Sequence, residues 1–160
     1  LFTDFKSNNN LTQDKFYLVG ENEGAGFVHR YLLFNPKGPV LKALAINPDF
    51  VTVPDKNISY PFGLKNSPVS NQNIKEWLSC DLTLVSTPER EVFQKKSLSN
   101  SPIAAIQGDS RNKRGEFLFN FTKIFAAKNK LNMNWSFKKL IRTEESKALK
   151  KQLFNLLIKE

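Results

Sequence analysis

The sequence predicts an α+β domain with antiparallel strands early, two amphipathic helices in the C-terminal third and a sandwich-like arrangement. In the first sixty or so residues, apolar segments are separated by Gly, Pro and Asn turn signals about every ten residues, a spacing typical of a β meander. Beyond residue 110, apolar residues instead recur at helical spacing. Residues 1–160 are therefore expected to form a single α+β domain, with an irregular lead-in over 1–14.

The expected strands are short runs rich in β-branched, aromatic and other apolar residues, each bounded by turn residues. They are residues 15–20, 27–34, 40–46, 50–53, 80–87 and 102–107. A short helical turn is expected at 71–77. Pro88 sits where a short helix or an edge loop would begin. Most of the chain before residue 110 thus reads as strands and turns.

Two helices are expected near the C-terminus. The first covers about 110–128 and is capped by Asp109 or Ser110. Its apolar face is formed by Phe117, Leu118, Phe121, Ile124 and Phe125. The second covers about 144–159 and is capped by Thr143. Its apolar face is formed by Leu149, Leu153, Leu156 and Leu157.

The charge balance indicates a polyanionic partner. Lys and Arg outnumber Asp and Glu by 24 to 15, which gives a net charge of +9. Nucleic acid is the first expectation and an acidic membrane surface the second. No apolar run approaches the roughly 20 residues needed to span a membrane. The chain opens on Leu1 without a signal-peptide pattern, and we expect it to be a fragment, a processed product or part of a longer protein.

Candidate catalytic and metal-binding groups are sparse. A single cysteine, Cys80, excludes an internal disulfide and a cysteine-based metal cluster, and the single histidine, His29, leaves no histidine-rich ligand set. Cys80 is expected to be a small half-buried side chain, and His29 a packed or surface residue rather than a base. The segment GENEGAG lacks the Lys-Ser/Thr of a phosphate loop, and no Gly-x-Ser-x-Gly turn is present. Scattered acids, among them Asp49 and Asp109, leave a metal-dependent nuclease open as an alternative. We expect no catalytic residue, metal, cofactor or small-molecule substrate.

Basic residues near the first C-terminal helix form the candidate site. A helix N-terminus offers free N–H groups to a phosphate, and Gly108 would permit close approach there. The expected RNA contacts are Gly108, Ser110, Arg111, Lys113, Arg114, Lys123, Lys128, Lys130, Lys138, Lys139 and Arg142. Arg111, Lys113 and Arg114 are the principal ones. Asp109 could instead satisfy the helix amides by itself.

Four segments resemble the C-terminal half of the sixth protein of the large ribosomal subunit. They are YLVG (17–20), FGLKNSPV (62–69), IAAIQGDSRNKRGEF (103–117) and RTEESKALKK (142–151). The NSPV segment lacks the histidine of the family's corner. The resemblance implies an α+β sandwich bound to large-subunit ribosomal RNA without catalysis, with Gly108, Asp109 and the helix start through Gly115 facing the RNA.

The expected function is therefore a structural, RNA-binding component of a ribosome, with ribosomal RNA and neighbouring ribosomal proteins as partners. Asn, Lys, Phe and Ile, which AT-rich codons encode, are frequent. Together with the divergence from the family, this composition favours a mitochondrial ribosome in the matrix. A second alternative is a non-catalytic protein–protein subunit of an organellar complex, in which the basic face meets an acidic partner.

Overall fold

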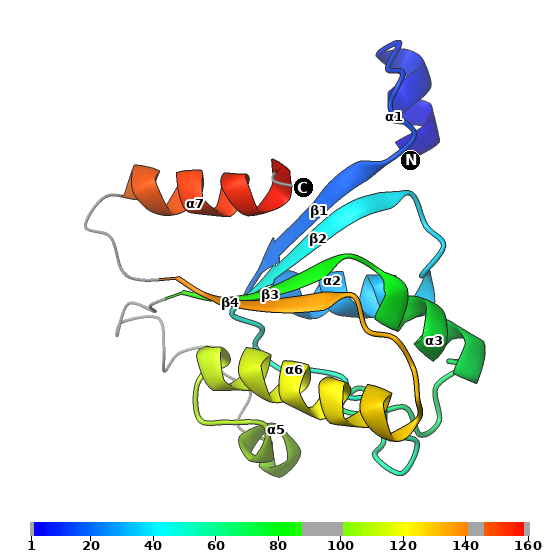
Figure 1. The fold of residues 1–160 in the computed structure, drawn as a ribbon, viewed down its shortest axis with the longest axis vertical. Coiled ribbons are helices and arrows are strands. Elements are labelled where there is room, and N and C mark those ends of the chain that lie inside the picture. Colours follow the sequence, from blue (N-terminus) through cyan, green and yellow to red (C-terminus); the bar gives the residue numbers. More distant parts are fainter. Residues whose placement is uncertain (1, 88–100, 141–145, 159–160) are drawn as a thin grey trace.

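A four-stranded sheet in which every strand is parallel to its neighbours organises the chain (Figure 1). The computed structural model describes residues 2–87, 101–140 and 146–158. The strands are β1 (Phe16–Glu21), β2 (Val40–Ile46), β3 (Leu82–Ser86) and β4 (Trp135–Lys139), and they lie side by side in that order. The prediction of antiparallel strands in an α+β sandwich is wrong, and the architecture is α/β.

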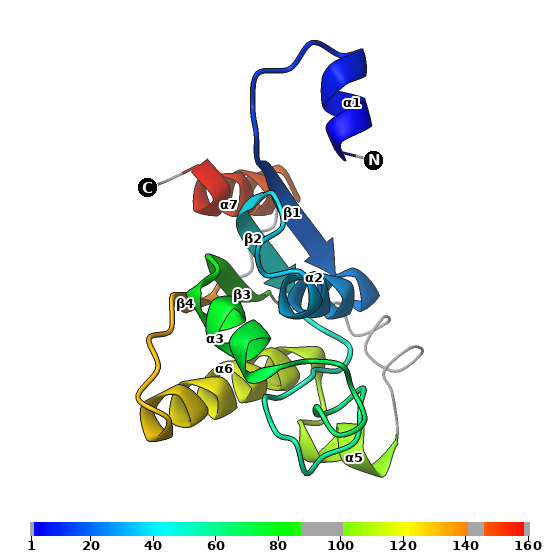
Figure 2. The same cartoon turned by 90° about the vertical axis from the view of Figure 1, so that its right-hand side faces the viewer.

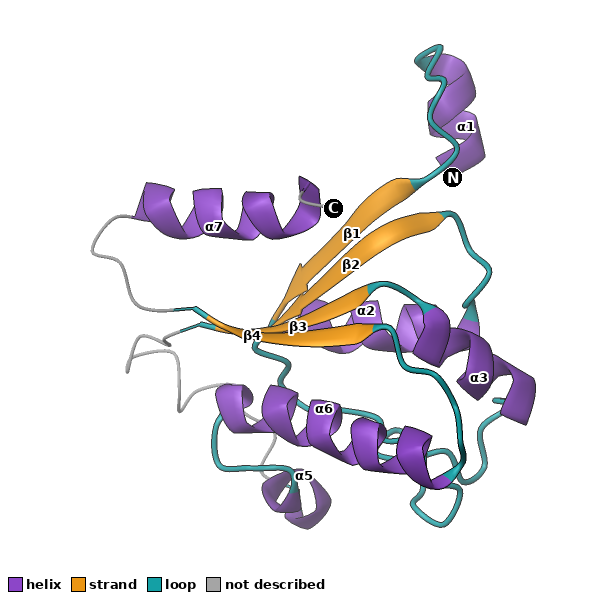
Figure 3. Cartoon of the chain, in the orientation of Figure 1, coloured by secondary structure: helices purple, strands orange, loops and turns teal. Residues whose placement is uncertain are grey.

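Helices connect the strands, as parallel pairing requires (Figure 3). They are α2 (Glu23–Phe34), α3 (Asn71–Ser79), α5 (Pro102–Ile106) and α6 (Arg111–Lys128). When the strand order advances in one direction, right-handed crossovers place the connecting helices on one face of the sheet. Figure 1 shows α2, α3 and α6 on that face, and α7 (Ser146–Ile158) on the other. The chain begins with α1 (Phe2–Asn8), which Figure 2 shows projecting beyond the sheet.

Two expected strands are helices in the structure. Residues 27–34 alternate well enough to resemble a strand, but they belong to α2, whose buried residues Ala25, Val28, His29, Leu32 and Leu33 follow helical spacing. Residues 102–107 form α5, because Ser101 caps the Ala104 amide and Pro102 occupies the first turn. Residues 50–53 belong to no strand.

Six other expected elements are present in the structure. Strands were expected at 15–20, 40–46 and 80–87, where β1, β2 and β3 lie, and helices at 71–77, 110–128 and 144–159, where α3, α6 and α7 lie. Strand β4 was not expected, and neither was α1 in the lead-in. The segment after Pro88 and the cap at Thr143 lie outside the described residues.

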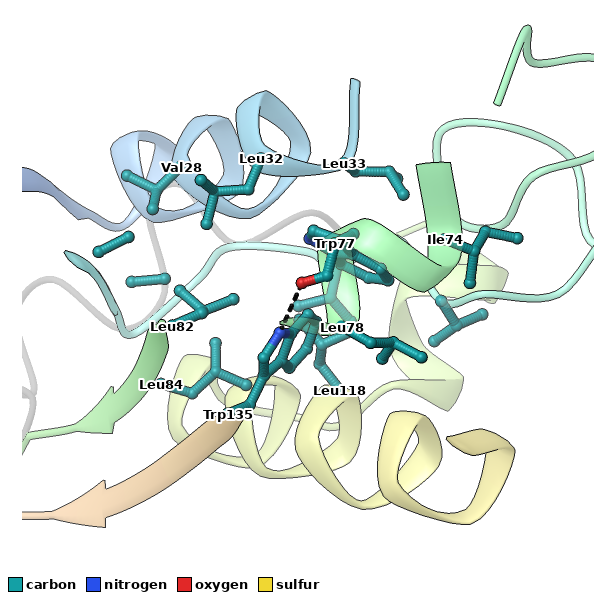
Figure 4. Close-up of a cluster of buried hydrophobic side chains, with 14 of the residues drawn as sticks. Val28, Leu32, Leu33, Ile74, Trp77, Leu78, Leu82, Leu84, Leu118 and Trp135 are labelled. Carbon is teal, nitrogen blue, oxygen red and sulfur yellow. Dashed lines mark hydrogen bonds between the residues drawn. The ribbon is translucent and has the colours of Figure 1, made fainter. Parts of the chain in front are cut away.

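The main core lies between the sheet and the helices on its first face (Figure 4). Trp77 of α3 and Trp135 of β4 meet edge to face with ring centroids 4.4 Å apart. The Trp135 Nε1–H donates to the Trp77 carbonyl over 3.1 Å, and the Trp77 Nε1–H donates to the His29 carbonyl over 3.0 Å. These bonds satisfy both indole donors where water is excluded, so α2, α3 and β4 are held in one arrangement.

A smaller core covers the opposite face. Leu44, Ile46 and Val85 point away from the main core and pack against Leu140 and the apolar side of α7. The expected helix near the C-terminus therefore buries its leucines on the sheet, with Leu153, Leu156 and Leu157 in contact. Among the described helices, none has the length and apolar character needed to cross a membrane.

Candidate functional site

The sharpest feature of the structure is the turn that joins β1 to α2. Asn22 occupies its apex with φ 54° and ψ −114°, a combination outside the regions that non-glycine residues ordinarily adopt. The Asn22 N–H donates to the Ile46 carbonyl over 3.0 Å, and the Asn22 carbonyl accepts from the Gly26 amide over 3.2 Å. The strained residue is thus fixed from both sides at the carboxyl edge of the sheet.

Gly20 makes this turn possible. A Cβ added to Gly20 would lie 2.2 Å from the carbonyl oxygen of Gly24, which is far inside van der Waals contact. Strand β1 and helix α2 therefore approach too closely for any side chain at residue 20. The local sequence is Gly20-Glu21-Asn22-Glu23-Gly24, a Gly-x-Asn-x-Gly motif at a strand-to-helix turn.

The loop after β2 lies beside this turn. Asp49 donates its backbone N–H to the Asn22 carbonyl over 3.4 Å. Asn47, at φ 49°, donates from Nδ2 to the Thr87 hydroxyl over 2.7 Å, and its Oδ1 accepts from the Thr87 N–H over 2.9 Å. The carboxyl ends of β1, β2 and β3 are therefore joined by hydrogen bonds. In open parallel sheets, this edge is where ligands bind.

A buried polar network fixes the same loop to α5 and α6. The Arg111 Nη2 lies 3.3 Å from Asp49 Oδ1, and both side chains are almost fully buried. Arg114 donates from Nε to the Gly108 carbonyl over 2.9 Å and from Nη1 to the Asp49 carbonyl. Gln107 makes two hydrogen bonds to the Val51 backbone. Its Nε2 donates to the Val51 carbonyl over 2.7 Å, and its Oε1 accepts from the Val51 N–H over 2.9 Å.

This network changes the interpretation of the expected RNA contacts at the start of α6. Ser110 is the N-cap and accepts from the Lys113 amide, and Gly108 precedes it with φ +135°. Arg111 and Arg114 are buried and face the loop after β2 instead of a phosphate. Lys113 is exposed and pairs with Asp109 over 2.8 Å, an interaction that lowers the pKa of the Asp109 carboxyl.

The remaining basic residues do not join that corner. Lys123, Lys128 and Lys130 are exposed along and just beyond the second half of α6. Lys138 and Lys139 are exposed at the end of β4. Arg142 lies outside the described residues.

Neither His29 nor Cys80 supplies a reactive group at this edge of the sheet. The His29 Nδ1 donates to the Ala25 carbonyl over 2.9 Å, and its Nε2 accepts from the Thr52 amide over 3.1 Å, so the ring is neutral and fully engaged. Burial lowers the pKa of His29 to about 3. Burial also raises the pKa of the half-buried Cys80 thiol to about 11, with Glu76 adding to the shift. Neither group is poised to act as a base or nucleophile at neutral pH.

A metal-dependent nuclease gains no support from the described residues. Across 2–87, 101–140 and 146–158, no group of three or more His, Cys, Asp or Glu side chains lies close enough together to hold an ion. Asp49 faces Arg111, and Asp109 faces Lys113, so these two acids have cationic partners.

The turn itself presents hydrogen-bond donors. The half-buried Asn22 side chain carries two Nδ2–H donors. Glu23 begins α2, so its amide has no carbonyl partner four residues back within the helix. Donors at the positive end of a helix suit an oxygen that carries partial negative charge, such as a substrate carbonyl.

Comparison with solved structures identifies the fold. A poly(aspartic acid) hydrolase-1 from Sphingomonas sp. KT-1 matches with a TM-score of 0.88 and 26% sequence identity, over 99% of this chain and 60% of that one. A poly(3-hydroxybutyrate) depolymerase from Bordetella parapertussis matches with a TM-score of 0.86 and 21% identity, over 98% of this chain and 53% of that one. The chain thus spans a little over half the length of each. No protein-family model matches the sequence, and neither does any curated protein.

These matches correct the expectations drawn from the sequence. Both neighbours are hydrolytic enzymes by name, so the resemblance to a ribosomal protein, the RNA-binding function and the expectation of a non-enzyme are wrong. The partner prediction of ribosomal RNA and ribosomal proteins fails with them, and neither the nuclease nor the protein–protein subunit is better supported.

One signal in the sequence pointed to this turn. In α/β hydrolases, Gly-x-Ser-x-Gly places the catalytic serine on a strained strand-to-helix turn. Here Gly20 and Gly24 keep that spacing after a strand, but Asn22 takes the serine position, and a search for serine passes over it. The parallel sheet, its connecting helices and this turn together make the chain α/β-hydrolase-like in fold.

Proposed function

We propose that this protein is of hydrolase type and binds the carbonyl group of an ester- or amide-linked polymer at the carboxyl edge of the sheet. The observation that carries the proposal is the strained apex at Asn22, which projects a side chain from the turn where hydrolases of this fold place their reactive group. Strain of this kind persists where function requires it. In this proposal the Nδ2–H of Asn22 and the N–H of Glu23 donate to the substrate oxygen.

The chemistry of the side chain defines its part. An amide nitrogen is a hydrogen-bond donor and a poor nucleophile, so Asn22 orients and polarises a carbonyl without forming a covalent bond to it. The only histidine of the sequence, His29, is buried with both ring nitrogens bonded, so it does not relay a proton from this position. Asn22 is accordingly a binding residue in this proposal.

Charge favours an anionic polymer. The sequence has a net charge of +9, and a chain of carboxylates would be drawn to such a protein at low salt. The Sphingomonas neighbour is named for poly(aspartic acid), whose side chains are ionised at neutral pH. An amide-linked polyanion is therefore our first choice of ligand, with its uncharged backbone carbonyl at the turn and its ionised groups directed away from the exposed Glu21 and Glu23.

The test measures binding and turnover on the same samples. Poly(aspartic acid) oligomers and 3-hydroxybutyrate oligomers are titrated against the protein by calorimetry, and acid release is followed at constant pH. Asn22→Ala is expected to weaken oligomer binding about tenfold, the effect of losing a hydrogen bond of about 1.4 kcal/mol. Any acid release is expected to fall in the same variant.

Asn66→Ala is the matched control. Asn66 is also an asparagine at positive φ, 64°, but it is exposed on the loop before α3. Its replacement should leave binding within twofold of the parent. Equal binding by the parent and Asn22→Ala, or no binding of either oligomer, would overturn the proposal.

A further inference from the structure

A cavity of about 550 Å³ lies among the helices that cover the first face of the sheet. It is formed by the second half of α6, the start of α3 and the loop after Pro54, segments that Figures 1 and 2 show close together. Ile124, at the cavity, lies thirteen residues after Arg111, which corresponds to about 20 Å along a helix. Since Arg111 contacts the loop beside Asn22, the two sites are distinct.

The floor of this cavity is apolar. Ile74 is buried beneath it, and Phe121 and Phe125 are half-buried. Ile124 has 57% of its surface exposed, so it offers apolar surface to a ligand in the cavity. A concave apolar surface of this size is typical of a site that takes a small organic ligand.

The rim is cationic. Lys56 donates from Nζ to Asn71 Oδ1 over 2.7 Å, which holds its ammonium group at the cavity. Lys128, the last residue of α6, is exposed and also lines the cavity. Asp55 also lines the cavity, but its Oδ1 accepts from the Asn57 N–H over 2.7 Å and from the Asn57 Nδ2 over 3.0 Å, so this carboxylate is turned to its own loop.

We propose that this cavity binds a small amphipathic carboxylate, with its apolar body on Phe121, Ile124 and Phe125 and its carboxylate between Lys56 and Lys128. Apolar burial supplies most of the affinity, and the two ammonium groups select an anionic head. The proposal does not depend on binding at Asn22. It would give the protein a second site, suited to aliphatic acids rather than to the polymer backbone.

The experiment titrates decanoate into the full chain and follows the amide signals of Ile124 and Phe125 by NMR. Decylammonium, which has the same tail and the opposite charge, is titrated in parallel. Decanoate is expected to shift both signals and to bind at least fivefold more tightly than decylammonium. Equal affinity for the two probes would remove the cationic rim from the proposal and overturn it.

Substitutions at the cavity test whether decanoate binds there. Lys128→Gln is expected to weaken decanoate about fivefold, and Ile124→Asn by a similar factor without lowering the unfolding midpoint, because the side chain is exposed. Lys123→Gln is the matched control, since Lys123 is exposed on the same helix but does not line the cavity. An identical affinity in Lys128→Gln and Lys123→Gln would contradict the proposal. Asn22→Ala should leave decanoate binding unchanged, so failure at one site is distinguishable from failure at the other.

Discussion

Arg111 of α6 and Asp49 of the loop after β2 form an ion pair, 3.3 Å between Nη2 and Oδ1, with 2% and 10% of their side-chain surfaces exposed. A sequence with a net charge of +9 invites the interpretation that each arginine meets an external anion. Here the anion is internal, because the loop beside Asn22 must be fixed to the helix that begins next to it. Arg111 thus supports the carboxyl edge of the sheet.

Breaking this pair from one side should be costly. Arg111→Met leaves the Asp49 carboxylate buried opposite an apolar side chain, and we expect the free energy of unfolding to fall by about 3 kcal/mol or more. Adding Asp49→Asn removes the carboxylate charge that Arg111 faced, so the double variant should be more stable than Arg111→Met alone. Urea unfolding of the two single variants and the double variant completes the cycle. Additive losses would mean that the two residues are not coupled.

The close approach of β1 and α2 at the turn predicts that Gly20 cannot be replaced without a loss of stability. Gly20→Ala is expected to lower the free energy of unfolding by about 3 kcal/mol, because its Cβ would overlap the Gly24 backbone, which cannot rotate away. Gly24→Ala is the matched control on the other side of the turn, since nothing lies within 4 Å of a Cβ there. Its effect should stay within about 1 kcal/mol, with helix propensity favouring Ala. Similar losses in both variants would contradict the close approach at Gly20.

Elements with strong local signals could be predicted from the sequence. The run VLKALAI at 40–46 is β2, and the Ser110 cap begins α6 where the apolar spacing changes to helical. In contrast, FVHRYLLF at 27–34 satisfies a rough alternation and also helical spacing, and the packing of Val28, Leu32 and Leu33 on the sheet decides between them. If residues 27–34 are taken as a strand, no helix is left to connect β1 to β2. The predicted sheet is then antiparallel instead of parallel.

The site was harder to predict than the elements. Asp49 and Arg111 are far apart in the sequence, and only the parallel order of the strands brings the loop after β2 to the start of α6. Asn22 could have been found from Gly20, Gly24 and the strand before them, provided that the motif was searched by backbone requirement instead of by the identity of the nucleophile. Gly20 permits the close approach of β1 and α2 there, whereas Asn22 stands where Gly-x-Ser-x-Gly has its serine.

Backbone strain at Asn22 should appear as a difference in the free energy of unfolding between two variants. Asn22→Gly relieves a backbone conformation with φ 54° and ψ −114°, whereas Asn22→Ala retains it, so we expect the Gly variant to be more stable than the Ala variant by about 1–2 kcal/mol. Both variants lose the side-chain amide and should bind polymer oligomers equally weakly. Thermal or urea unfolding gives the first quantity and calorimetry the second. Equal stability of the two variants would show that residue 22 is unstrained in solution.

His29 should make the fold sensitive to mild acid. Its pKa is lowered to about 3 in the folded protein by burial, against about 6.5 when unfolded, so between these values the unfolded chain binds the additional proton. Stability is fully present above pH 6.5 and is lost as the pH falls toward 3. Between pH 7 and pH 5 this loss should amount to about 2 kcal/mol.

His29→Gln isolates the effect of the imidazole. Glutamine can still accept from the Thr52 amide but does not titrate, so this variant should be less stable at pH 7 and lose much less stability between pH 7 and pH 5 than the parent. Urea unfolding at both pH values gives the two slopes. If both proteins lost the same stability between pH 7 and pH 5, the acid sensitivity would belong to carboxylates and not to His29. Carboxylates with a lowered pKa, such as Asp109 beside Lys113, act mainly at lower pH.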